Sequence, residues 1–243
     1  RHYTSIDGLP TNTIYQMCQD SHKFLWFTSD AGVIKFDGST FTSYRKKDGL
    51  SSNDVVRIKE DAQGRIWFFN YNATVNYFYQ NKIYNEENAP FLKQLVGKGF
   101  IIDFFTDSSK RIYFYNYQRE VFILDLKNRV IKDSLLLNFN AAYSRGTQLN
   151  PRVCFLNKTS STEWEIWTSY GIYSENIHNG LIRIIDKTWR ARYVFPGRNN
   201  SFYVLPYNYS DGIVNFTNDR RKVIIPINGD AQQIRSIIED SEG

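Results

Sequence analysis

The sequence predicts an all-β protein that forms most of a β-propeller, a ring of four-stranded sheets called blades. Three observations lead to this fold class. The 243 residues include 17 Tyr and 18 Phe, which suit half-buried strands. An aspartate followed six residues later by a large aromatic residue recurs along the chain. The recurrence has a period of about 40–50 residues, which is typical of propeller blades.

Three segments carry the repeat most clearly. In each, aliphatic or aromatic residues flank the large aromatic residue on both sides. The aligned segments are Ile14–Thr28, Val55–Phe69 and Ile101–Tyr115, with the pairs Asp20 and Trp26, Asp61 and Trp67, and Asp107 and Tyr113. We interpret the aspartate as the end of one strand, because its carboxylate can accept backbone N–H groups from the turn that follows. The next strand then places the aromatic side chain in the core between blades.

Later copies of the repeat are weaker. Val153–Ser169 is a fourth copy with Trp167, Ser201–Phe216 is a degenerate fifth copy centred near Tyr203, and Ile234–Gly243 restarts the motif. After each aromatic strand, a hairpin leads to a third strand and then to a fourth. The sequence therefore predicts blades at roughly 11–50, 51–90, 97–140, 150–190 and 198–230, with a further blade beginning at 231–243.

The two ends of the chain fall at unequal points of the repeat. Tyr3–Ile14 aligns with Tyr44–Val55, so the chain opens with the outer strand of a blade. It closes on an inner strand, whose backbone groups would be unpaired without the strands that normally follow. We therefore expect about five blades, cut from a larger ring in a longer polypeptide.

The charge, hydropathy and cysteine pattern argue against a nucleic-acid-binding protein, a membrane segment and a disulfide. The net charge of +5 arises from 30 basic and 25 acidic residues, and basic runs such as Arg45–Lys47 lie beside turns. We interpret these runs as solvated turns and expect no nucleic acid partner. No run of 18 apolar residues occurs, so we expect no membrane segment within the chain. Cys18 and Cys154 lie in apolar segments three repeats apart, which predicts two buried thiols without a mutual disulfide.

The sequence shows little sign of catalytic chemistry. The three histidines are scattered, no spacing of ligands predicts a metal site, and no nucleophile-elbow sequence is present, so we expect no cofactor and no enzymatic activity. A glycosidase would need two carboxylates, for which Asp103 and Glu120 are candidates only by exclusion. Asp103 shares a polar inner-strand position with Gln16 and Arg57, where side chains would face a central channel. The simpler interpretation is that this position has no active role.

The repeat resembles that of the two-component-regulator propeller family. The matching residues are Asp20 with Leu25–Thr28, and Asp61–Phe68, and the opening Arg1–Ile14 resembles the start of the mature sensor region in that family. The resemblance implies the periplasmic sensor part of a membrane-bound signalling protein, usually a histidine kinase joined through a β-sandwich domain and a membrane helix. It also implies glycan sensing, which is common among such sensors in Bacteroidetes-like bacteria. No kinase segment occurs in this chain.

The hairpin that follows each aromatic strand is the candidate ligand site. Aromatic rings can stack on the apolar face of a sugar, while neighbouring amides bond its hydroxyls. Hairpin residues of this kind are Asn70, Tyr71, Asn72, Asn116, Tyr117, Tyr170, Tyr207 and Tyr209, to which the inner-strand residues Arg57 and Asp103 are added. We expect these hairpins to lie on the same face as the blade-to-blade loop Asp48–Asp54. Ordinary turn chemistry is the alternative explanation for Asn and Tyr there.

Three functional classes follow from this sequence. The first is a ligand-sensing propeller, with an oligosaccharide or other small molecule as ligand and with the downstream sensor and kinase domains of the same polypeptide as partners. The second is a scaffold for protein interaction or homodimerisation. The third, less favoured, is a glycan-active enzyme.

Overall fold

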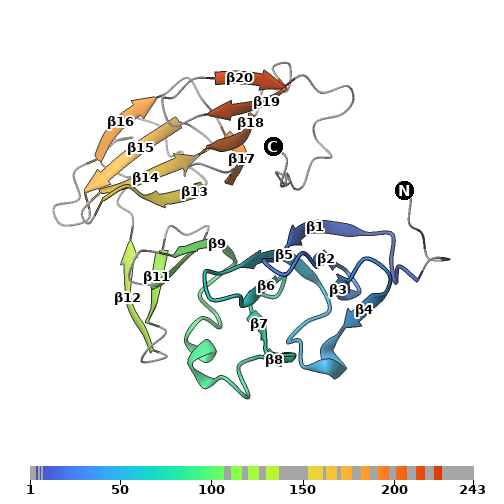
Figure 1. Ribbon diagram of the computed structural model, residues 1–243. Helices are drawn as coiled ribbons and strands as arrows, with labels where there is room; N and C mark the ends of the chain where they lie inside the picture. Colours follow the sequence, from blue (N-terminus) through green and yellow to red (C-terminus); the bar gives the residue numbers. More distant parts are fainter. Residues whose placement is uncertain are drawn as a thin grey trace. The chain divides into compact units, whose positions relative to one another are not determined.

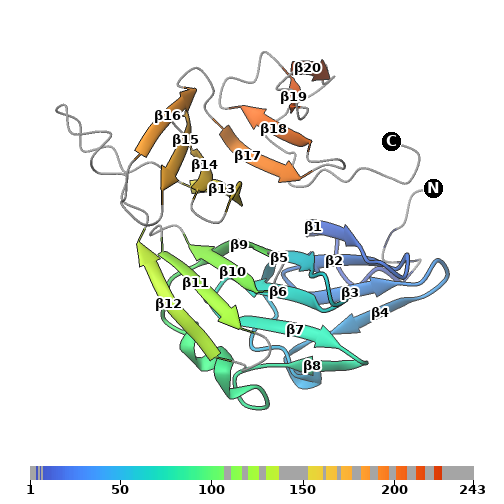
Figure 2. The same cartoon turned by 60° about the vertical axis from the view of Figure 1, so that its left-hand side comes forward.

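The computed structural model describes residues 4, 6, 8–106, 111–116, 120–125, 130–136, 153–160, 163–168, 171–176, 182–186, 191–196, 201–206, 212–216 and 222–225. In this part of the chain the strands form five four-stranded sheets, and neighbouring strands follow one another in sequence (Figures 1 and 2). The registered strand pairs are antiparallel. The prediction of an all-β fold built from four-stranded blades is therefore confirmed.

The chain divides into two compact units, Arg1–Ser134 and Leu135–Gly243. The first sheet contains β1 (Ile14–Gln19), β2 (Leu25–Ser29), β3 (Gly32–Phe36) and β4 (Phe41–Tyr44). The second contains β5 (Val55–Glu60), β6 (Ile66–Asn70), β7 (Val75–Tyr79) and β8 (Lys82–Tyr84), and the third contains β9 (Ile101–Thr106), β10 (Ile112–Asn116), β11 (Glu120–Asp125) and β12 (Val130–Leu136). The connections after the first two sheets include the 3-10 helices η2 (Lys46–Asp48) and η3 (Pro90–Gln94).

The later unit repeats the same arrangement. The fourth sheet contains β13 (Val153–Lys158), β14 (Glu163–Thr168), β15 (Gly171–Asn176) and β16 (Ile182–Asp186). The fifth contains β17 (Ala191–Pro196), β18 (Phe202–Pro206), β19 (Ile213–Phe216) and β20 (Lys222–Ile225). The fifth sheet thus begins at Ala191, ahead of the range 198–230 of the predicted fifth blade. The predicted further blade at 231–243 lies outside the described residues.

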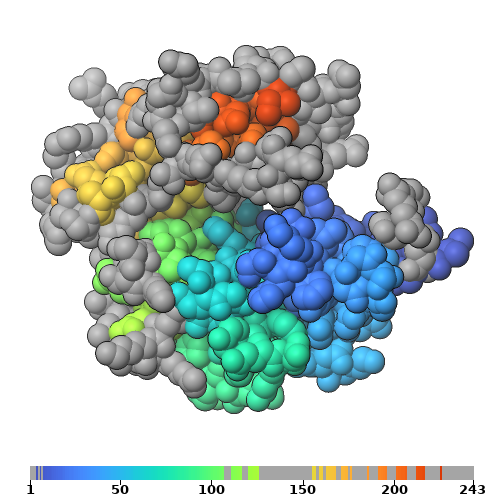
Figure 3. All heavy atoms as spheres, in the orientation of Figure 1, coloured from blue at the N-terminus to red at the C-terminus, as the bar shows by residue number. Residues whose placement is uncertain are grey.

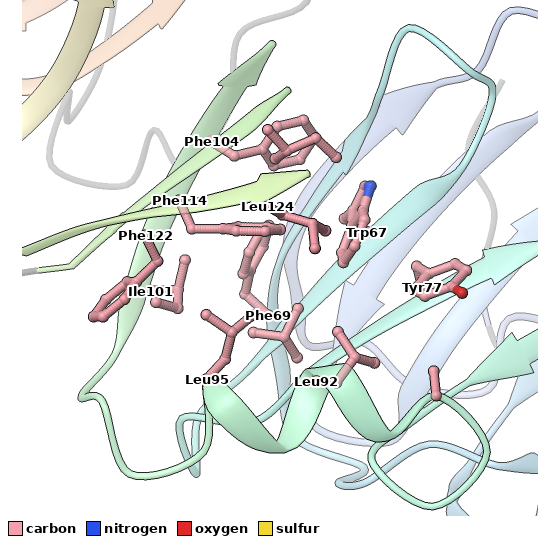
Figure 4. Close-up of a cluster of buried hydrophobic side chains, with 13 residues drawn as sticks. Trp67, Phe69, Tyr77, Leu92, Leu95, Ile101, Phe104, Phe114, Phe122 and Leu124 are labelled. Atoms are coloured by element: carbon pink, nitrogen blue, oxygen red, sulfur yellow. The ribbon is translucent and has the colours of Figure 1, made fainter. Parts of the chain in front are cut away.

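Both faces of β6 are buried, which explains its continuous apolar run. Trp67 and Phe69 point toward the third sheet, where they pack with Phe104 and Phe114 (Figure 4). Helix η3 adds Leu92 to this cluster and precedes Leu95, which also packs there. The alternate residues of β6, among them Phe68, pack against the first sheet. The repeated aromatic residue is thus core between neighbouring sheets, as predicted.

The core between the first two sheets is equally aromatic. Trp26 lies 5.0 Å from Phe78 and 6.0 Å from Phe68, measured between ring centroids. Each such ring removes roughly 150–250 Å² from water, so these contacts dominate the stability of the unit. Figure 3 shows the outer surface of these two sheets, coloured from blue to cyan.

The inner strand of every sheet contains a β-bulge near its start. The register shifts fall between Ile14 and Gln16, and at the corresponding positions of β5, β9, β13 and β17. The extra residue is Tyr15 in β1, Val56 in β5 and Ile102 in β9. A bulge re-aims its extra side chain, and bulges are common beside functional sites. The repeat alignment did not reveal this feature.

Candidate functional site

The aspartate of each of the first two repeats closes the turn after the inner strand. Asp20 Oδ1 accepts hydrogen bonds from the backbone N–H groups of His22 and Phe24, both at 2.9 Å. Its other oxygen, Oδ2, accepts from the indole Nε1 of Trp26 at 2.8 Å. The expected turn role of the aspartate is confirmed, and the bond to Trp26 explains the six-residue spacing.

The second repeat reinforces the same arrangement with a cation. Asp61 Oδ2 accepts from Trp67 Nε1 at 2.8 Å and from Arg65 Nε at 2.6 Å. The Asp61 side chain is fully buried, while Trp67 has no exposed surface. Asp61 Oδ1 accepts from the backbone N–H groups of Gln63 and Arg65, so both oxygens of this carboxylate hold its own blade together, which is a structural role.

The polar inner-strand residues connect neighbouring blades. Gln16 Oε1 accepts from the backbone N–H of Ile58 at 3.0 Å. Asp103 accepts from Lys59 Nζ at 3.0 Å, and Lys59 also donates to the carbonyl oxygen of Phe104 at 2.6 Å. Within the described part of the chain, Arg57 is partly exposed and forms no ion pair.

Each candidate carboxylate of a glycosidase has its own structural partner. Asp103 pairs with Lys59, and Glu120 Oε2 accepts from the amide of Asn116 at 2.7 Å. Asn116 is fully buried and also receives a hydrogen bond from the Glu120 backbone at 2.9 Å. These contacts assign Asn116 and Glu120 to the closure of their hairpin.

The hairpin after β6 presents two of the predicted site residues at the surface. Tyr71 is 72% exposed, the most exposed aromatic residue among those described. Asn72 is also exposed, and its Oδ1 accepts from the Thr74 backbone N–H at 3.2 Å and from the Thr74 hydroxyl at 2.7 Å. The ring of Tyr71 is thus available to a ligand, while Asn72 still has its amide N–H groups to donate.

This hairpin is fixed to the blade-to-blade loop. The Tyr71 backbone N–H donates to the carbonyl oxygen of Asp54 at 2.9 Å. Asn76 receives a hydrogen bond from the Ser51 backbone at 3.0 Å and donates one to the Ser51 hydroxyl at 2.7 Å. The prediction that the hairpin and loop share one face is confirmed for this blade. Tyr117, Tyr170, Tyr207 and Tyr209 lie outside the described residues, so their place in the site stays a prediction.

Three residues that the sequence analysis missed as site candidates, Tyr15, Asp30 and Asp54, lie near one another. The bulged Tyr15 has its pKa raised by partial burial, by the negative charges of Asp54 and Asp30, and by a hydrogen bond with Asp54. Asp30, in the hairpin of the first blade, accepts from the Thr11 hydroxyl at 3.0 Å. We call Tyr15, Asp30, Asp54, Asn70 and Tyr71 the junction residues, because the first two blades meet there.

Only one sequence signal could have indicated this group. Asp30 and Tyr71 occupy the same place in the first and second hairpins, since Ser29 and Asn70 align. The bulge that re-aims Tyr15 depends on strand register, which the repeat pattern alone does not give. Within the described residues, no group of three or more His, Cys, Asp or Glu side chains could hold a metal ion.

Known proteins with similar sequences include propeller repeats, in agreement with the blades described above. Residues 8–31 and 49–72 match the profile of the family described as "Two component regulator propeller". Two stretches of the chain thus match the two-component-regulator propeller repeat. The two matches run from the blade-to-blade loop through the Asp–Trp turn to the hairpin, so they include Tyr15, Asp30, Asp54 and Tyr71.

Solved structures share the fold at low sequence identity. The extracellular domain of a proposed hybrid two-component system of B. thetaiotaomicron is 16% identical, with a TM-score of 0.57 over 81% of this chain and 27% of that one. A second such domain from the same organism is 15% identical, with a TM-score of 0.51 over 97% of this chain and 38% of that one. Streptogramin B lyase is 16% identical, with a TM-score of 0.62 over 97% of this chain and 76% of the enzyme.

The chain spans well under half the length of those extracellular domains. No protein of curated function matches its sequence. Among the described residues, no helix has the length and apolar character needed to cross a bilayer.

Proposed function

We propose that this chain is the ligand-sensing propeller of an extracytoplasmic, periplasmic sensor in a two-component signalling protein, without catalytic activity of its own. The repeat match and the likeness to extracellular domains of signalling systems support the sensor assignment. The parent protein would carry the signalling domains, most simply a histidine kinase, on the same polypeptide.

The exposed Tyr71 is the observation that carries the ligand assignment. Its backbone is fixed to the Asp54 carbonyl, so the ring is presented from a braced hairpin rather than from a loose loop. Exposed aromatic rings beside free amide donors suit the stacking and hydrogen bonding of sugars. We therefore propose oligosaccharides as the ligand class.

A catalytic role has less support from the described residues. Streptogramin B lyase shows that this fold also serves enzymes. In this chain, however, Asp103 and Glu120 are engaged by Lys59 and Asn116 respectively. Neither carboxylate of the glycosidase alternative is therefore available without breaking a contact within the fold.

Thermal unfolding of the complete sensor protein against a panel of oligosaccharides tests this proposal. A ligand at a hundred times its Kd adds about 2.7 kcal/mol to the free energy of unfolding, which is readily measured. We expect Tyr71→Ala to abolish the shift and Tyr71→Phe to retain it, because Phe preserves the stacking surface. A panel without any responding sugar would refute the glycan assignment, and clear self-association in its place would favour the scaffold class.

A further inference from the structure

The polar inner-strand position is used differently in the first three blades. In the first blade, Gln16 accepts from the backbone N–H of Ile58 at 3.0 Å, and in the third, Asp103 accepts from Lys59 at 3.0 Å. Arg57 holds this position in the second blade, and within the described part of the chain its guanidinium has no hydrogen-bond or ion-pair partner. Of these three residues, Arg57 is therefore the one whose side chain the fold does not engage.

Arg57 carries the uncompensated charge of this part of the inner strand. Lys59, two residues further along β5, lies on the same face and is neutralised by Asp103. Its ammonium group also donates to the carbonyl oxygen of Phe104 at 2.6 Å and lies 5.1 Å from the centre of that ring. These contacts fix Lys59, while Arg57 is left without a counter-ion among the described residues. Arg57 is also partly exposed, so an anion from solution can reach it.

Strand register brings Arg57 close to the exposed Tyr71. Arg57 pairs with Phe69, so both lie on the face of the second sheet that is turned toward the third sheet, as Figure 4 shows for Phe69. Tyr71 follows Phe69 by two residues, and its backbone N–H is still bonded to the Asp54 carbonyl beside the start of β5. Diagonal neighbours of this kind lie about 7–8 Å apart. One short oligosaccharide can therefore reach both the guanidinium of Arg57 and the ring of Tyr71.

We propose that Arg57 binds the carboxylate of an acidic sugar whose chain lies against Tyr71. A guanidinium presents paired N–H donors in one plane, which match the two oxygens of a carboxylate, and its single positive charge suits a single carboxylate. Tyr71 supplies a stacking surface, and Asn72 has its amide N–H groups to donate to the sugar hydroxyls. This inference rests on the proposed sugar-sensing function and narrows its ligand to oligosaccharides that contain uronic acids.

Matched pairs of sugars test the inference. The probes are tetramers of galacturonic, glucuronic and mannuronic acid, each compared with its methyl ester, which lacks the charge. They are offered to the complete sensor protein at about pH 7, where free carboxylates are ionised. We expect at least one acid to bind about tenfold more tightly than its ester by calorimetry, because hydrogen bonds between charged groups are about twice as strong as neutral ones. That preference should shrink as salt is added, because charge attraction is screened.

Two results of this comparison would overturn the carboxylate assignment. Equal affinity for acid and ester in every pair would do so and would leave the sugar-sensing proposal standing. A tetramer of galactose 6-sulfate that binds more tightly than every acid tetramer would assign the position to a sulfate ester instead.

Variants locate the carboxylate at Arg57. Arg57→Gln removes the charge and introduces the residue type that the first blade has at this position, so we expect it to fold and to bind the acid about tenfold more weakly, with ester binding unchanged. Lys23→Gln is the control, because it removes an exposed positive charge in the turn at the other end of the strands, and it should bind as the parent does. If Arg57→Gln fails to fold, Arg57→Lys keeps the charge but loses the planar fork, and it should weaken acid binding about threefold. Unchanged affinity in a folded Arg57 variant would overturn the placement.

A sugar-free dicarboxylate separates this inference from the proposed function. If glutarate binds as tightly as the acid tetramers and Arg57→Gln abolishes its binding, the anion site stands and the sugar assignment fails. If a neutral oligosaccharide binds through Tyr71 while no acid tetramer binds at millimolar concentration, the sugar assignment stands and the acidic-sugar inference is refuted. If no probe binds, both are refuted. Acid binding that is lost in both Arg57→Gln and Tyr71→Ala supports both.

Discussion

Removing the Asp61 carboxylate should be among the most destabilising single changes in the first unit. Asp61→Ala removes the acceptor for Trp67 Nε1 at 2.8 Å, for Arg65 Nε at 2.6 Å, and for the backbone N–H of Gln63 at 2.8 Å. A hydrogen bond to a charged group contributes about 1.5–3 kcal/mol, and leaving the buried indole N–H without a partner costs about 1–3 kcal/mol. Because such terms are not additive, we expect a total loss of about 3–5 kcal/mol, measured by urea unfolding with circular dichroism.

A double-mutant cycle isolates the bond between Asp61 and Trp67. Trp67→Phe keeps an aromatic ring in the core but removes the indole N–H, so Asp61→Ala should cost about 1–3 kcal/mol less in that background. Asp20→Ala offers a comparison, since Asp20 makes the same bond to Trp26 at 2.8 Å but, among the described residues, has no arginine partner. Additive effects of Asp61→Ala and Trp67→Phe, within about 0.5 kcal/mol, would show that the bond does not stabilise the blade.

Three further predictions concern backbone conformation and thiol chemistry. Gly32 and Gly38 both have φ above 90°, but only at Gly32 would an added Cβ overlap a carbonyl oxygen, that of Tyr44. Gly32→Ala should therefore lower the free energy of urea unfolding by at least about 2 kcal/mol more than Gly38→Ala does. Lys23 and Gly64 occupy equivalent turn positions in the first and second blades, with φ of 72° and 75°, a conformation that favours glycine. Lys23→Gly should therefore raise the free energy of unfolding by about 0.5–1 kcal/mol, and Gly64→Lys should lower it by a similar amount. Burial raises the pKa of Cys18 from 9.0 to about 11, so little of the reactive thiolate is present in the folded protein at about pH 8. In a Cys154→Ser background, iodoacetamide should therefore react with Cys18 at least tenfold more slowly in the folded protein than in urea. Equal rates would contradict this. The same shift favours the protonated thiol in the fold, so its contribution to stability is present below pH 9.0 and is lost as the pH rises toward 11.

The fold could be predicted because its signals are local and repeated. The spacing from Asp20 to Trp26 and from Asp61 to Trp67 is required by a hydrogen bond within each blade, so it is readable in the sequence. The first strand of the fifth sheet, β17, begins at Ala191, ahead of the approximate range predicted for the fifth blade, and it lacks the polar and apolar pattern that marks the inner strands of the first three blades. Cys18, expected to be buried, is a free and partly buried thiol that packs against the edge of the core between the first two sheets, because β1 is the least buried inner strand of the first unit.

The candidate site was predicted less completely, because it depends on register and on contacts between blades. The hairpin pattern identified Tyr71 and Asn72, which are exposed as a ligand site requires. The same pattern selected Asn116, whose amide is occupied in closing its own hairpin. Tyr15 was missed because the bulge of β1 is visible only in the pairing with β2. Asp30 follows Ser29, which pairs with Ile14 in the same blade, whereas Asp54 belongs to the next blade and reaches Tyr15 only where the two blades pack.

The first two blades separate buried, hydrogen-bonded positions from exposed ones within a single repeat. The aspartate, its turn and the tryptophan bond to one another inside the blade. A substitution there would therefore lower the stability of the blade, and these groups have few hydrogen bonds left to offer a ligand. At the opposite end of the same strands, Ser29 and Asn70 close the hairpins, while the residues after them, Asp30 and Tyr71, differ in chemistry and are exposed. We therefore expect substitution at these two positions to leave the core undisturbed, because neither side chain contributes to the buried clusters. On this reasoning, exchanging Asp30 and Tyr71 should leave the unfolding free energy within about 0.5 kcal/mol while changing sugar affinity, and a large loss of stability would contradict the separation.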